Sequence, residues 1–262
     1  MIMRTARLRP FVLLLTALAV LAVSTDAVAK RDKKEKKSKL YDCEKRFEKA
    51  MERYERGWHN DAATILEEVQ FQCGGHHLVD SVLYFLGMAH LYADHPIDAK
   101  NQFRRIVDNY PNSPFYEEAR FRLGYCTHVG SYSYDRDQTE TRQAIRELSE
   151  FVMVFPESEW ADSAKYYIDV CREKLAHKEF ATARFYHRID KLDAAAVYYR
   201  SVLDEYADSR YAPESRLYLA QTLAQTNRVT EAENVIDELI EGQYSEDIKR
   251  RARQLRLRLN EG

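Results

Sequence analysis

Histidine, cysteine and carboxylate side chains are the residues of this 262-residue chain that could do chemistry, but their spacing matches no known reactive motif. The sequence has no glycine-rich phosphate loop, no G-x-S-x-G, no H-E-x-x-H and no C-x-x-C. Four histidines invite comparison with a metal cluster: His76, His77, His90 and His95. Their spacing fits no metal site of a known type. We therefore predict no catalytic site, no cofactor and no metal site, and the net charge of −2 predicts no nucleic-acid partner.

A stripe of aromatic and methionine side chains is more informative. On one expected helix such residues recur every four positions from 84 to 92, beside the residues that fill the helix seam. The stripe could be core, but equivalent offsets recur on the next helix of the same kind. We therefore predict a groove for an extended peptide with apolar or aromatic side chains. Its residues are Tyr54, Tyr84, Met88, Tyr92, Phe121 and Tyr125, although the register of the first helix leaves the facing of Tyr54 open.

The helices that position this stripe belong to a repeat. Between Leu86 and Pro111 the order of apolar, small and proline residues is typical of a tetratricopeptide (TPR) hairpin, in which small residues let two helices approach. An alanine at the crossing recurs at Ala62, Ala99, Ala144, Ala195 and Ala232. We predict an all-α, right-handed superhelix of five TPR repeats with a C-terminal capping helix. The expected helices are 41–57, 61–72, 76–93, 97–110, 114–128, 142–155, 160–188, 193–206, 213–225, 230–241 and 246–259.

Two intervals between the crossing alanines are longer than the others, because of a loop insertion and a long helix over 160–188. The domain organisation that follows has five parts. They are a signal peptide (1–29), a basic disordered leader (30–39), an N-terminal TPR half (40–128), an insertion loop (129–141) and a C-terminal TPR half (142–262).

The N-terminus is typical of a secretory signal peptide. Basic residues precede an apolar run over 11–23, and the small residues before Lys30 predict cleavage between Ala29 and Lys30. An uncleaved inner-membrane anchor is the alternative, but the run is shorter than the ~20 residues of a spanning helix. No cysteine lies near the cleavage site, so there is no lipobox and we expect no lipid anchor. The leader holds seven basic and two acidic residues, which favours a solvated segment over contact with an anionic membrane.

Export also bears on the four cysteines, because disulfides form in oxidising compartments. Cys43 and Cys73 lie at equal distances on either side of Trp58, where the first hairpin is expected to turn. Residues equidistant from such a turn face each other across the two helices. We predict a Cys43–Cys73 disulfide and free thiols at Cys126 and Cys171.

Two segments go beyond a general TPR pattern. One is D-R-D-Q-T from Asp135, and the other is L-A-x-x-E-x-x-x-A-x-F-Y from Leu175 to Tyr186. Both resemble the BamD family, the TPR component of the outer-membrane protein assembly (Bam) complex. The positions singled out by the resemblance are Asp135, Arg136, Asp137, Gln138, Leu175, Glu179, Ala183 and Tyr186.

The resemblance implies a non-catalytic periplasmic scaffold at the outer membrane that acts in protein insertion into that membrane. Its N-terminal repeats would recognise unfolded outer-membrane protein clients, and its C-terminal repeats would contact the POTRA domain of the barrel subunit. Other assembly lipoproteins are possible partners, and membrane association would come mainly through partners.

Two other classes are less favoured. A periplasmic TPR adaptor of another envelope system, such as the Tol-Pal cell-division coordinator, would carry a coiled coil before its repeats, whereas only residues 30–39 precede them here. An enzyme of cell-wall metabolism is disfavoured by the absence of catalytic motifs.

Overall fold

Helices make up all the regular structure between residues 43 and 261. The computed structural model describes residues 43–261, so the expected signal peptide and basic leader lie outside the described residues. The chain divides into two units, the first ending at Ala93 and the second beginning at Asp94. The all-α class and the tandem helix hairpins predicted from sequence are confirmed for residues 43–261.

The described part of the first unit, residues 43–93, contains three helices. A helix over residues 43–55 precedes α2 (His59–Gln72), and α3 (Val79–Tyr92) packs against α2. One core cluster joins all three helices. Its buried members include Ala50, Leu66, Val69, Val82, Leu86 and Ala89. The apolar stripe of each helix therefore meets the others, as burial of one face requires.

The second unit contains eight helices. They are α4 (Pro96–Asn109), α5 (Tyr116–Val129), α6 (Thr139–Val154), α7 (Ala161–Arg188), α8 (Leu192–Glu205), α9 (Ala212–Gln225), α10 (Val229–Glu241) and α11 (Glu246–Glu261). Each helix packs against the next along the chain. In addition, α5 contacts α7, α7 contacts α9, and α9 contacts α11. The first helices of successive hairpins thus lie side by side, as in a stack of repeats.

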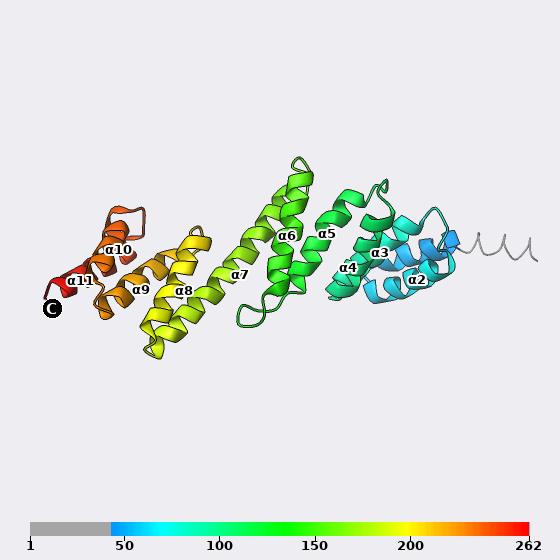
Figure 1. The fold of residues 1–262 in the computed structure, drawn as a ribbon. Helices are drawn as coiled ribbons and strands as arrows, with labels where there is room; N and C mark the ends of the chain where they lie inside the picture. Colours follow the sequence, from blue (N-terminus) through cyan, green and yellow to red (C-terminus); the bar gives the residue numbers. More distant parts are fainter. Residues whose placement is uncertain (1–42, 262) are drawn as a thin grey trace, which may run out of the picture. The chain divides into compact units, whose positions relative to one another are not determined.

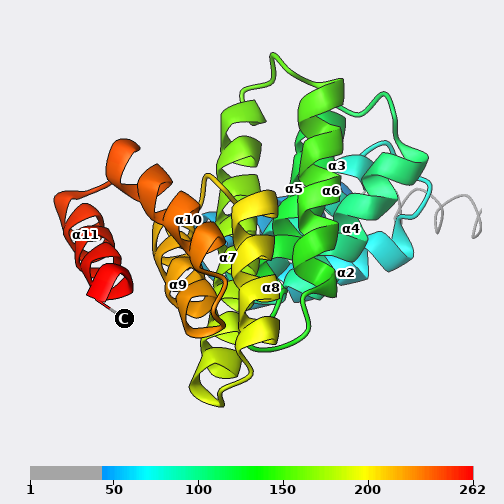
Figure 2. The ribbon, with the colours of Figure 1, turned by 60° about the vertical axis from the view of Figure 1, so that its left-hand side comes forward.

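The long helix α7 serves two hairpins, as the sequence predicted. Its 28 residues make a helix about 42 Å long. The N-terminal half of α7 runs beside α6 and its C-terminal half runs beside α8 (Figures 1 and 2).

Small residues occupy the helix crossings. The five predicted crossing alanines, at 62, 99, 144, 195 and 232, are fully buried. At Gly124 in α5, an added Cβ would lie 2.7 Å from Cγ of Leu148 and 3.2 Å from its backbone nitrogen. The side chain of Leu148, on α6, therefore occupies the space that a side chain at Gly124 would need.

The turns inside the hairpins share one backbone conformation. Gly57, Asp94, Asp190 and Asn227 each lie in the short turn that follows a helix, and they have φ between 57° and 78°. This left-handed region is open to glycine and is tolerated by Asp and Asn, so the residue types suit the turns. The third hairpin has the inserted loop at this place.

Two predicted boundaries need correction. The loop between α5 and α6 covers residues 130–138, because residue 129 ends α5 and residues 139–141 form the first turn of α6. The division of the chain falls after Ala93 and not at the insertion. The reason is that Phe121 of α5, Leu148 of α6 and Ala164 of α7 share one core cluster, so the loop does not separate two halves.

Candidate functional site

Aromatic rings gather between the first helix and α3 in the first unit. Tyr54 lies edge-on to Phe85, with ring centroids 5.5 Å apart, and 6.1 Å from Tyr92. His59 stacks on Tyr92 at 4.6 Å, and Tyr84 lies edge-on to Phe85 at 5.2 Å. The Tyr92 side chain is 60% exposed, whereas the other rings are half-buried. We call these five residues the N-terminal ring cluster, and it offers apolar ring surface to a ligand.

The six residues predicted to line a groove differ in how far they are buried in the structure. Four are half-buried or exposed: Tyr54, Tyr84, Tyr92 and Tyr125. Met88 and Phe121 are only 6% and 2% exposed, so they belong to the core, which corrects the prediction. Helical spacing could not distinguish the two roles, because a helix such as α5 packs against α4, α6 and α7 and so buries more than one face.

A second set of rings joins α5 to α7. Phe121 stacks on Trp160, with centroids 5.3 Å apart, and the guanidinium of Arg122 lies 4.9 Å from the Trp160 ring. Tyr125 lies edge-on to Tyr167 at 4.9 Å. Burial raises the pKa of the Tyr167 hydroxyl. The sequence analysis did not include Trp160 and Tyr167 among the candidate site residues. Their position at the beginning of the long helix was the one signal that could have indicated packing on α5.

The D-R-D-Q motif shapes the inserted loop. Gln138 is 1% exposed, and its amide nitrogen donates to the carbonyl oxygens of Ser133 (2.7 Å) and Arg136 (3.1 Å). Asp137 accepts a hydrogen bond from the first backbone N–H of α6 at 3.2 Å. Asp135 accepts one from the hydroxyl of Ser133. Hydrogen bonds to these carboxylates hold the pKa of each Asp below its usual range. The motif therefore has a structural role, in closing the loop and starting the helix.

Two lysines of α7 hold the loop in place. Lys174 Nζ donates to the carbonyl oxygen of Tyr132 at 3.1 Å, and Lys178 Nζ donates to that of Arg136 at 2.6 Å. Because carbonyl groups of the loop are bound by side chains of the long helix, the loop lies along α7.

A cavity of about 500 Å³ lies where the loop meets α7. Tyr134, Tyr166 and His177 line it, together with Arg210 from the segment after α8. The His177 ring stacks between Tyr134, at 3.6 Å, and Tyr211, at 4.8 Å. Burial and then the charge of Arg210 lower the pKa of His177. His177 is therefore mainly neutral at pH 7. The cavity combines aromatic walls with two cationic side chains, Lys174 and Arg210, and two carboxylates, Asp169 and Glu173.

The second family motif lies in the C-terminal half of α7. Leu175 and Ala183 are core residues, 4% and 0% exposed. Tyr186 stacks on Tyr198 of α8, with centroids 5.4 Å apart. Glu179 is half-buried, and burial raises its pKa. These residues fix α8 against α7, so this motif is also mainly structural.

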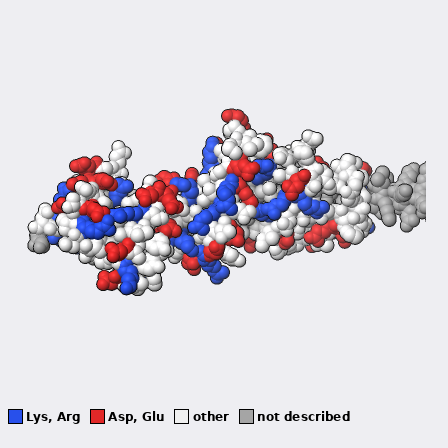
Figure 3. All heavy atoms as spheres, in the orientation of Figure 1, with Lys and Arg blue, Asp and Glu red and all other residues white. Residues whose placement is uncertain are grey.

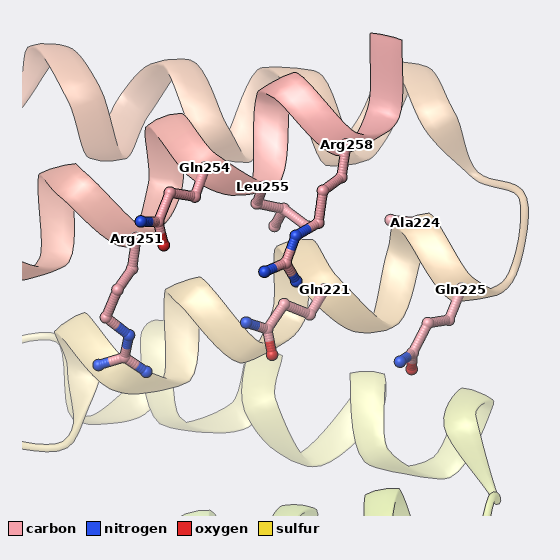
Figure 4. Close-up of a pocket in the computed structure, with 7 residues that line it drawn as sticks. All are labelled: Gln221, Ala224, Gln225, Arg251, Gln254, Leu255 and Arg258. Atoms are coloured by element: carbon pink, nitrogen blue, oxygen red, sulfur yellow. The ribbon is translucent and has the colours of Figure 1, made fainter. Parts of the chain in front are cut away.

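A second hollow, of about 480 Å³, lies between α9 and α11 (Figure 4). Gln221 projects into it from α9, and Gln254 and Arg258 project from α11. Arg251 lines one edge and donates to both carboxylate oxygens of Glu214, at 2.6 and 3.0 Å. The hollow is polar and carries cationic groups, so it suits a partner with carboxylate or carbonyl oxygens.

On the face drawn in Figure 3, acidic and basic side chains of the described residues are interspersed. Within residues 43–261, no helix is both long enough and apolar enough to cross a membrane.

The cysteines fall into two kinds. A disulfide joins Cys43 to Cys73, with the Cα atoms 6.1 Å apart, which is the pairing expected from their spacing. Cys126 and Cys171 are free and buried. Burial raises the pKa of Cys126 to about 12 and that of Cys171 to about 11. Since the thiolate is the reactive form, both free thiols are unreactive at neutral pH.

The four histidines singled out in the sequence do not form one group. His90 is 8% exposed, and its Nε2 lies 3.6 Å from Oε1 of Glu67. His76 and His77 lie in the turn before α3, whereas His95 belongs to the second unit.

These features define a helical repeat protein with a ring-lined surface in its first unit and a polar hollow near its C-terminus. The chain belongs to the outer membrane lipoprotein family YfiO, whose family model matches residues 41–239. The sequence resemblance to the BamD family is thereby confirmed.

Individual relatives agree with this family. The chain is 26% identical over 170 residues to the outer membrane protein assembly factor BamD of Caulobacter vibrioides, covering 65% of this chain and 56% of that protein. It is 27% identical over 154 residues to the same factor of Neisseria gonorrhoeae, covering 53% of this chain and 58% of that protein. The matched region thus spans little more than half the length of these relatives. A thermophilic TPR protein of Thermus thermophilus is 17% identical, with a TM-score of 0.36, over 82% of this chain and 99% of that one.

Proposed function

We propose that this chain acts in the assembly of outer-membrane proteins, as a non-catalytic scaffold in the periplasm that is associated with the outer membrane. The proposal is supported by its family and by relatives that are named as outer membrane protein assembly factors. In this role the chain holds an unfolded client with one surface and a partner subunit with another.

The observation that carries the client-binding part is the N-terminal ring cluster. A segment of an unfolded barrel protein that will become a β-strand presents apolar and aromatic side chains at alternate positions. Tyrosine rings bind such groups at a low cost in conformational entropy. Tyr92 is 60% exposed, and the adjoining rings of Tyr54 and Tyr84 extend the same surface. The corrected groove therefore excludes Met88 and Phe121, because buried side chains cannot contact a peptide.

The partner-binding part is assigned to the C-terminal repeats. The hollow between α9 and α11 offers hydrogen-bond donors from Gln221, Gln254 and Arg258. We assign it to the POTRA domain of the barrel subunit, since a folded domain can present acidic side chains and carbonyl groups to these donors.

Peptide binding provides the direct test of the client surface. A labelled peptide from the C-terminal strand of an outer-membrane barrel protein is titrated against the purified chain by fluorescence anisotropy. Tyr84→Ala with Tyr92→Ala should raise Kd about tenfold, or ~1.4 kcal/mol. The matched control is Phe71→Ala, because Phe71 on α2 is 90% exposed and lies outside the ring cluster. An equal loss of binding in the control variant would refute the assignment.

The partner surface is tested in the same way. Arg258→Glu with Gln254→Glu should abolish co-purification with the barrel subunit, whereas Arg250→Glu, also on α11 but outside the hollow, should retain it. Loss of many barrel proteins after depletion of the chain would support the assembly role. Normal barrel levels together with failed cell constriction would overturn it in favour of a Tol-Pal-type adaptor.

A further inference from the structure

The turn between α2 and α3 brings two histidines to a carboxylate that is distant in sequence. His76 and His77 lie in this turn, and Glu44 lies one residue after Cys43 on the first helix. One ligand atom from each of these three side chains lies within 4.8 Å of the other two. Among the described residues, no other group of three histidine, cysteine or carboxylate side chains meets this spacing.

The disulfide explains why these segments meet. Cys43 and Cys73 are bonded, with Cα atoms 6.1 Å apart, which places Glu44 beside the segment that follows Cys73. The backbone N–H of His76 donates to the carbonyl oxygen of Cys73 at 2.9 Å, and the N–H of Val79 donates to that of His76 at 3.2 Å. The backbone that carries the histidines is therefore fixed relative to the disulfide.

The donor set is that of a transition-metal site. Imidazole nitrogen and carboxylate oxygen bind Zn²⁺ at about 2.0–2.2 Å, and three protein ligands with one water complete a tetrahedral site. In such a site neighbouring donor atoms lie roughly 3.3 Å apart. The three ligand atoms now lie within 4.8 Å of one another, so each separation must shorten by at most about 1.5 Å. Glu44 and His77 are exposed and can rotate, and the two imidazole rings are already neighbours, with centroids 4.2 Å apart.

One existing contact must change. The backbone N–H of Leu78 donates to Nδ1 of His76 at 3.4 Å, which is long for a hydrogen bond. Coordination through Nε2 places the ring proton on Nδ1, so this contact is given up when the metal binds. A long and partly exposed hydrogen bond of this kind is readily replaced by water.

We propose that Glu44, His76 and His77 form a binding site for one Zn²⁺ ion. The bound ion joins the first helix to the turn before α3, so it links the same two segments as the Cys43–Cys73 disulfide. Zinc binding therefore stabilises the first unit and preserves its hairpin when the disulfide is reduced.

The test uses the untagged, exported chain, with its disulfide intact, titrated with ZnCl₂ by isothermal calorimetry after treatment with EDTA. We expect one ion per chain and a rise in Tm that EDTA reverses. His76→Ala, His77→Ala and Glu44→Gln should each raise the Kd for Zn²⁺ at least tenfold, with unchanged circular dichroism. His95→Ala is the matched control, because His95 is an exposed histidine outside the cluster.

Two outcomes would overturn the proposal. One is the absence of saturable binding at 100 µM Zn²⁺. The other is an equal loss of affinity in the His95 control and in the three site variants, which would indicate non-specific binding to surface histidines. With the disulfide reduced, zinc should still raise the Tm of the parent chain but not that of the His76→Ala variant.

Discussion

Two hairpins of this chain use different means to keep their helices together. The hairpin of residues 43–55 and α2 has a disulfide between Cys43 and Cys73 at its open end. The hairpin of α5 and α6 has no covalent link, but at Gly124 a neighbouring leucine fills the space of the missing side chain. It also has an ion pair with a neighbouring helix, since Nζ of Lys100 on α4 lies 2.9 Å from Oε1 of Glu147 on α6.

The difference follows from the neighbours of each hairpin within its unit. Among the described residues of the first unit, the hairpin packs on α3, whereas in the second unit α5 contacts α4, and both α5 and α6 contact α7. A hairpin with few neighbours buries less apolar surface, and a cross-link compensates by restricting the unfolded chain. A hairpin packed on both sides can depend on close packing and polar contacts, without a cross-link. Four predictions follow, in order of decreasing effect.

Phe121→Ala should have the largest effect, because the ring is 2% exposed and stacks on Trp160. Replacing a buried Phe with Ala typically costs 3–5 kcal/mol of unfolding free energy, so we expect a loss of about that size. Urea unfolding provides the measurement. Tyr92→Ala, with the ring 60% exposed, should change the unfolding free energy by less than about 1 kcal/mol. Similar losses in both variants would contradict the assignment of one ring to the core and the other to the surface.

Removal of the disulfide should have the next largest effect. The bond closes a loop across a sequence separation of 30, for which the chain-entropy model gives about 3–4 kcal/mol. Cys43→Ser with Cys73→Ser should lower the stability of the first unit by about this amount, as measured by hydrogen exchange of α2. Exchange of α6 should be nearly unchanged. Thiol titration of the unreduced parent chain should find two free thiols, and four would show that the bond is absent in solution.

Gly124→Ala probes the close fit in the other hairpin. The new Cβ would overlap Leu148, including its backbone nitrogen at 3.2 Å, so α5 and α6 must move apart. Such overpacking costs about 1–3 kcal/mol, partly offset by the ~1 kcal/mol that alanine gains over glycine in a helix. Thermal unfolding should show a lower Tm. Gly75→Ala is the control, because nothing lies within 4 Å of a Cβ there. A higher Tm for Gly124→Ala would mean that the crossing has room for a methyl group.

Acid should weaken the second unit slightly. Burial lowers the pKa of His128, His177 and His187, so these rings stay neutral in the folded chain below pH 6.5. The unfolded chain takes up protons there while the folded chain does not, and stability therefore falls as the pH falls below about 6.5. Urea midpoints at pH 7.5, 6.5 and 5.5 measure this. His177→Gln should reduce the decline, and an unchanged decline would show that His177 does not contribute to it.

Sequence patterns predicted the helices and turns well, but they predicted less well which side chains are buried and which are exposed. The crossing alanines, the long α7 and the turn at Trp58 follow from spacing and local residue preference, and all appear in the structure. Met88 and Phe121 were misplaced, because helical periodicity does not reveal how many neighbours a helix has. The approach of Glu44 to His76 was not visible either, since it depends on the three-dimensional course of the hairpin.

The length of α7 also bears on how the chain unfolds. In an array of separate hairpins, each repeat can open with a penalty only at its two borders. Here a single uninterrupted helix of 28 residues belongs to two successive hairpins, so neither can unravel without ending that helix inside its span. Opening one hairpin alone would create a new helix end within α7 and expose the buried Leu175, and both would raise the free-energy barrier to partial unfolding. The segment from α6 to α8 should therefore behave as one cooperative folding unit, and proteases should find no early cleavage site within it.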